Sequence, residues 1–269
     1  VDEGNSGEAN ANKNTEKYVA WQWKCNGGTE SGSFSEVGTN PGVSFQANTT
    51  AGFSICTYTG TGGNGSFAHG LGVAPEWIIV KGRDIATDGM VYHGANTSAP
   101  ETDALTQPET SATSDNAGWW NDTAPTSSSV YIGTHDRVNT DGKLFIAYCF
   151  ASIQGYSKFG SYAGNGNADG AFIYTGFKPA FVIQKQTNAD GEFWMMKDST
   201  REPFNQTDAN VYPNAQNAEV DTNGIDLLSN GFKCRTAGAG SNADGATYIY
   251  IAFAESPFVS SEGVPTTAR

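Results

Sequence analysis

The strongest constraint on the fold is an internal repeat with a period of roughly a hundred residues. Five positions recur without a gap 104 residues further along. They are Tyr58, Gly60, Gly72, Pro75 and Lys81, matched by Tyr162, Gly164, Gly176, Pro179 and Lys185. A closing hydrophobic run, Phe145–Ala151, recurs 103 residues later as Tyr248–Ala254. Self-similarity at a fixed spacing indicates duplicated structural units, and it predicts two of them, at residues 51–153 and 154–258.

A third copy of the closing run stands near the start of the chain, at Tyr18–Lys24. In each copy an asparagine precedes the first aromatic residue by six positions, at Asn12, Asn139 and Asn242. We therefore interpret residues 1–50 as the closing strand of an upstream unit followed by a linker, and residues 259–269 as a tail. The alternative is that Tyr18–Lys24 is simply an N-terminal strand of the first unit.

The hydrophobic runs within the repeats have the character of strands. Trp77–Val80 and Phe181–Ile183 are short, rich in β-branched and aromatic residues, and begin soon after a proline. Glycine-rich turns separate the runs, and no stretch sustains the 3.6-residue period of an amphipathic helix. The pattern predicts an all-β protein built of tandem antiparallel β-sandwich units, of jelly-roll or lectin-like type.

Charge and cysteine content exclude several classes of protein. With 15 basic and 28 acidic residues the formal charge is −13, which disfavours binding to nucleic-acid phosphates or to anionic lipid. No apolar run is long enough to insert into a membrane as a helix. The four cysteines lie far apart without a Cys-x-x-Cys pair, so we expect free thiols and neither a metal nor a cofactor.

Several short sequence motifs in the chain resemble those of a known family. They are Gly70–Lys81, Trp120–Pro125, Tyr148–Ala151, Leu228–Lys233 and Phe253–Phe258. Together they resemble a repeat domain common in structural proteins of marine bacteriophages, including cyanophages, where it lies toward the C-terminal part of tail-fibre-like proteins. The resemblance spans about Tyr18 to Phe258 and supplies no catalytic residues.

The resemblance implies a virion protein, assembled in the bacterial host cytoplasm, that displays loops on a rigid β scaffold. Its expected partners are other virion proteins and a host-surface receptor or glycan. By the same analogy we expect a homotrimer, and a monomer in light scattering would contradict that. The chief rival is a purely structural virion module, such as a capsid decoration or fibre shaft, without receptor contact.

The polar segment Pro100–Pro125 of the first unit contains the predicted receptor or glycan site. Trp119 and Trp120 are followed by Asn121 and Asp122, and exposed aromatics beside amides and acids are typical of sugar binding. Neighbouring residues of a strand point to opposite faces, so one indole would be core and the other exposed. Arg83 and His93 are added as further candidates. The competing interpretation is that both indoles are structural.

The third class of function considered is an enzyme, and we expect that the protein has no enzyme activity. A polysaccharide depolymerase would need two nearby carboxylates, for which Glu76, Asp84 and Asp88, or Glu192 and Asp198, are the candidates. The loop at 165–170 starts like a calcium loop but has Gly176 where a bidentate glutamate belongs. The three histidines lie in unrelated contexts and predict no catalytic or zinc site.

Overall fold

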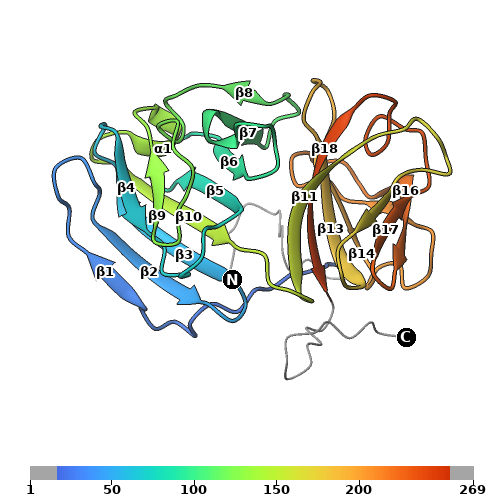
Figure 1. Ribbon diagram of the computed structural model, residues 1–269, viewed down its shortest axis with the longest axis horizontal. Coiled ribbons are helices and arrows are strands. Elements are labelled where there is room, and N and C mark those ends of the chain that lie inside the picture. The colour runs from blue at the N-terminus through green and yellow to red at the C-terminus, as the bar shows by residue number, and fades with distance from the viewer. Residues whose placement is uncertain (1–16, 255–269) are drawn as a thin grey trace, which may run out of the picture.

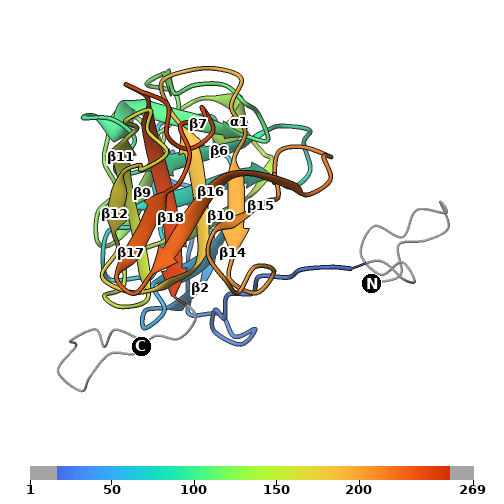
Figure 2. The ribbon, with the colours of Figure 1, turned by 90° about the vertical axis from the view of Figure 1, so that its right-hand side faces the viewer.

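The computed structural model describes residues 17–254 as four β-sheets stacked in layers, with all strand pairings antiparallel. Figure 1 shows the two units side by side, and Figure 2 views the second unit from its outer side. This confirms the predicted all-β fold of sandwich-like units. The described residues include only the four-residue helix α1 (Asp136–Asn139) and a 3-10 turn at Pro100–Thr102, and none of their helices is long and apolar enough to cross a membrane.

The first unit has an eight-stranded sheet covered on its outer face by a two-stranded sheet and α1. The eight strands, in spatial order, are β1 (Gly32–Phe34), β2 (Val43–Asn48), β3 (Phe53–Thr59), β10 (Leu144–Phe150), β5 (Trp77–Gly82), β6 (Gly89–His93), β7 (Asp103–Gln107) and β8 (Ser114–Asp115). The two covering strands are β4 (Gly65–Ala68) and β9 (Ser129–Ile132).

The second unit consists of two four-stranded sheets packed face to face. The inner sheet has the order β11 (Ser157–Ala163), β18 (Thr247–Ala254), β13 (Pro179–Gln186) and β14 (Met195–Asp198). The outer sheet has the order β12 (Phe172–Tyr174), β17 (Gly231–Cys234), β16 (Val220–Leu228) and β15 (Thr207–Asn210).

Strands β10 and β18, in the interior of the two central sheets, contribute side chains to a core on each face, which explains why they are hydrophobic without alternation. In β10, Phe145 and Cys149 belong to the core under the two-stranded sheet, whereas Tyr148 and Phe150 point into the core between the units. Strand β18 divides its residues in the same way between two cores. Successive strand side chains point to opposite faces, so a strand whose residues enter a core on each face is apolar at consecutive positions.

The two units repeat the same hydrogen bonds at corresponding positions. Tyr58 donates its hydroxyl hydrogen to the backbone oxygen of Val138 at 2.6 Å, and Tyr162 does so to Ser241 at 2.7 Å. The amide oxygen of Asn139 accepts the backbone N–H of Thr61 in the first unit. Asn242 accepts the N–H of Asn165 in the same way, so Asn139 and Asn242 each tie the turn before a closing strand to the turn after β3 or β11.

The N-terminal segment differs from the prediction in two ways. Strand β2 pairs with β3, and β1 pairs with β2, so residues 32–48 belong to the sheet of the first unit and are not a linker. The expected closing strand at Tyr18–Lys24 is wrong, because these residues form no strand. Trp21 and Trp23 instead pack into the core between the units, where Trp23 lies 5.7 Å from the ring of Phe181. Burial of indole surface, and not strand pairing, positions this segment. Asn12 and the tail at 259–269 lie outside the described residues.

Candidate functional site

The predicted tryptophan platform is not on the surface. Trp119 is 5% exposed and Trp120 is 1% exposed, and both belong to the core of the first unit. The indole N–H of Trp120 donates to the backbone oxygen of Asp103 at 2.9 Å, and its ring meets Tyr92 edge to face. The prediction of an exposed indole is therefore wrong. Both residues lie within a turn at residues 117–122, and both rings lie in the core that the two-stranded sheet covers.

The two polar residues after the tryptophans take part in that turn. Asn121 and Asp122 both have left-handed backbone conformations, with φ of 54° and 44°, which asparagine and aspartate tolerate better than most residues. Asp122 is exposed, but no exposed aromatic side chain accompanies it in this turn. These residues are therefore explained by the geometry of the turn, and they do not assemble with Arg83 or His93.

His93 is buried between the units and is not available to a ligand. It is 1% exposed, and its Nε2 lies 3.2 Å from the backbone oxygen of Tyr250 in the second unit. Its Nδ1 accepts the backbone N–H of Ala95, so the proton of the neutral ring is on Nε2. Burial lowers the pKa of His93 to about 4. His93 thus links the two units as a neutral donor.

Acidification is expected to weaken the fold through His93. The unfolded histidine takes up a proton near pH 6.5, whereas the folded ring does so only near pH 4. Stability is therefore lost as the pH falls from 6.5 to 4, by about 3 kcal/mol. Urea unfolding of the wild type and of His93→Gln at pH 7, 5.5 and 4 measures this. The variant should lack this part of the loss, and an equal loss in both proteins would contradict the assignment.

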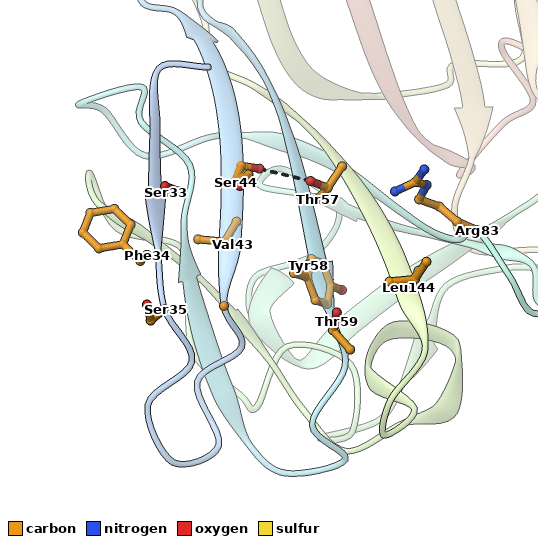
Figure 3. A pocket seen from close by; sticks show the side chains of 11 residues that line it. Ser33, Phe34, Ser35, Val43, Ser44, Thr57, Tyr58, Thr59, Arg83 and Leu144 are labelled. Atoms are coloured by element: carbon orange, nitrogen blue, oxygen red, sulfur yellow. Dashed lines mark hydrogen bonds between the residues drawn. The ribbon is translucent and has the colours of Figure 1, made fainter. Parts of the chain in front are cut away.

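Arg83 is the one predicted site residue that lines a surface hollow. It follows β5, and its backbone N–H donates to the oxygen of Leu144 at 2.8 Å, which fixes the start of the side chain. Among the described residues its guanidinium has neither an ion pair nor a hydrogen bond. Figure 3 shows it at one end of a shallow groove, with Phe34 at the opposite end.

The groove lies on strands β1, β2, β3 and β10 and encloses about 350 Å³. Val43 and Tyr58 point into the core on the other side of the sheet, so their neighbours Ser44 and Thr57 face the groove. Register places Ser33, Ser44 and Thr57 side by side across three strands. The result is a row of hydroxyl groups that leads toward an unpaired guanidinium.

The groove exists because the eight-stranded sheet is wider than the four-stranded sheet packed on it. The face that carries Ser44 and Thr57 also carries Ile55, which contributes to the core between the units. The hydroxyl row was not predicted, because the interpretation of residues 1–50 placed β1 and β2 outside the first unit. The available signal was the alternation of apolar and polar residues from Val43 to Gln46.

Four of the five candidate carboxylates bind groups of the fold through their side chains. Asp84 accepts the N–H of Leu144, Asp88 pairs with Arg137 and Asp198 pairs with Arg201. Glu76 accepts the N–H of Ser152 at the junction of the units. The backbone oxygen of Glu192 accepts a hydrogen bond from the amine of Lys185 at 3.0 Å.

The loop at 165–170 uses its oxygens within the protein. Asn165 accepts from the amide of Asn242, Asn167 accepts the N–H of Asp169, and Asp169 pairs with Lys233. In the part of the chain that the structure describes, no group of three or more metal-ligating side chains comes together. The four cysteines are free, and three of them are buried.

One comparison with known proteins gives a match. The model of a domain of unknown function (DUF7483) matches residues 1–257. Neither a curated protein nor a solved structure matches the chain.

Proposed function

Because this chain belongs to the family of the domain of unknown function DUF7483, its role has to be argued from its own geometry, and we propose that it recognises a saccharide. In this proposal it is a module without enzyme activity in a phage virion, for example in a tail fibre or spike. It binds the surface polysaccharide of the bacterial host. The phage setting follows from the sequence resemblance, and the binding chemistry follows from the groove at Arg83.

The observation that carries the proposal is the unpaired guanidinium beside a row of hydroxyl groups. Sugars are recognised by closely spaced hydrogen-bond donors and acceptors. The hydroxyls of Ser33 and Ser44 supply both, and Thr57, whose hydroxyl donates to the backbone oxygen of Ser44 at 3.4 Å, supplies an acceptor. Arg83 supplies donors in a fixed planar arrangement, suited to vicinal hydroxyls or to a carboxylate on the sugar. The row lies on paired strands with a core beneath it, so little order has to be gained on binding.

Replacing Arg83 tests the proposal. On an array of bacterial surface polysaccharides, Arg83→Ala is expected to weaken binding about tenfold, as for the loss of a charge-assisted hydrogen bond. Arg235→Ala is the matched control, because Arg235 is 40% exposed in its side chain and directly follows β17 in the second unit. Equal binding by wild type and Arg83→Ala, or an equal loss in the control, would contradict the assignment of the groove.

A purely structural role in the virion is the second candidate. The observation that favours it is the burial of Trp119, Trp120 and His93. These aromatic side chains of the first unit pack inside the protein and are not available to a ligand. Under this alternative the wild type binds no polysaccharide on the array, and Arg83→Ala gives the same result as the wild type.

A further inference from the structure

A second hollow lies at the junction of the two units. Its lining comes from the residue before β5, the turn between β10 and β11, and the end of β12. It encloses about 450 Å³, more than the groove at Arg83. Glu76 precedes β5 and Arg83 follows it, so the two hollows lie at opposite ends of that strand. We call this hollow the inter-unit cleft.

Three side chains in the cleft offer different chemistry. Tyr174 is 58% exposed, although its neighbour Ile173 is in the core. The amine of Lys158 lies 5.3 Å from the centre of the Tyr174 ring and donates to the Tyr174 backbone oxygen at 3.3 Å. These two contacts hold the aromatic ring at the rim of the cleft.

Glu76 supplies the acceptor. One oxygen of its carboxylate accepts the backbone N–H of Ser152 at 3.2 Å, which orients the group. The other oxygen makes no hydrogen bond or ion pair with the described residues. The cleft therefore presents an oriented carboxylate and an ammonium group that are not paired with each other.

The internal repeat shows that the fold does not require these groups. The residue corresponding to Glu76 in the second unit is Ala180, and the residue corresponding to Lys158 in the first unit is Ser54. The ungapped repeat places Gly70 at the position of Tyr174. The central strands of both units pair in the same way without them, so the acid, the amine and the ring serve something other than the shared architecture.

We infer that the inter-unit cleft binds a neutral pyranose unit of a polysaccharide. A tyrosine ring stacks on the C–H face of a sugar, a carboxylate accepts two neighbouring hydroxyls, and an ammonium donates to a ring or hydroxyl oxygen. Acidic sugars fit less well, since Glu76 faces the cleft and the chain carries a formal charge of −13. This inference extends the proposed saccharide recognition to a separate site, and it stands or falls independently of Arg83.

The test uses the full chain and neutral oligosaccharides of glucose, galactose and mannose, with uronic-acid oligosaccharides as the charged comparison. Affinities are measured by titration calorimetry. The wild type should bind at least one neutral probe more tightly than any uronic-acid probe. Tyr174→Ala and Glu76→Ala should each weaken that binding about tenfold. Tyr174→Phe, which keeps the ring, should stay within about threefold of the wild type.

Two control variants show whether the probe binds in this cleft or elsewhere on the protein. Phe172→Ala removes a neighbouring aromatic of β12 that is 47% exposed and does not line the cleft, and it should leave the affinity unchanged. A loss of binding in Arg83→Ala without a loss in Tyr174→Ala would assign the probe to the groove and overturn the inference. Absence of binding to every neutral probe, a preference for uronic acids, or equal losses in Tyr174→Ala and Phe172→Ala would overturn it as well.

Discussion

Trp120→Ala is expected to lower the free energy of unfolding by about 4 kcal/mol, as large-to-small changes of a buried aromatic do. The indole is almost completely buried, and removing it leaves a cavity beneath the covering sheet of the first unit. The change also removes the donor that satisfies the backbone oxygen of Asp103. Chemical denaturation monitored by circular dichroism measures the loss.

The matched control is Phe34→Ala, since Phe34 is 60% exposed at the far end of the groove. It should change the free energy of unfolding by less than about 0.5 kcal/mol. The folded fraction of Trp120→Ala should bind polysaccharide like the wild type. Unchanged stability together with lost binding would restore the indole as a recognition group.

Lys197 is expected to make the protein less stable near neutral pH than at pH 10. Its side chain is fully buried in the second unit, and its amine donates to the side-chain oxygen of Gln184 at 3.4 Å. Burial lowers the pKa of Lys197 to about 7 from an ordinary value of 10.5, despite nearby thiol and carboxyl groups that favour the charge. The first unit has Tyr92 and Val80 at the positions of Lys197 and Gln184.

The direction follows from which state binds the proton. Between pH 10.5 and pH 7 the unfolded lysine is charged and the folded lysine is not, so stability falls as the pH falls. The total is roughly 5 kcal/mol, and the fall ends below pH 7, where both states are charged. Lys197→Met should lack this fall and should therefore be more stable than the wild type at pH 7.

Unfolding free energies of both proteins between pH 7 and pH 9.5 provide the measurement. The difference between them isolates Lys197 from the tyrosines, which also titrate at high pH. Lys178→Met, at an exposed position, should follow the wild type in parallel. Parallel curves for Lys197→Met and the wild type would mean that the buried amine is charged in the folded protein.

Burial can be predicted from the sequence at Val80 but not at its counterpart Gln184. Val80 is an obvious core residue, and Gln184 at its counterpart is equally buried. A polar residue in a strand normally marks the solvent face, so the pattern alone places Gln184 outside. Only the packing of the outer sheet of the second unit on the inner one buries it, and the hydrogen bonds to Lys197 and Tyr162 then satisfy its amide.

The internal repeat, the all-β class and the strands β5, β10, β13 and β18 could be predicted from the amino-acid sequence. These are local properties, because turn chemistry and runs of β-branched and aromatic residues depend on a few neighbouring positions. The candidate site depended on which side chains are exposed to solvent, and that exposure is decided by how the sheets pack on one another. Stacking one unit on the other buried His93 and created the cleft at Glu76, while the extra width of the first sheet left Ser44 and Thr57 open beside Arg83. Those features follow from which part of each sheet face meets another sheet. The pattern of a strand indicates whether its faces are buried, but not which sheet covers which part of them.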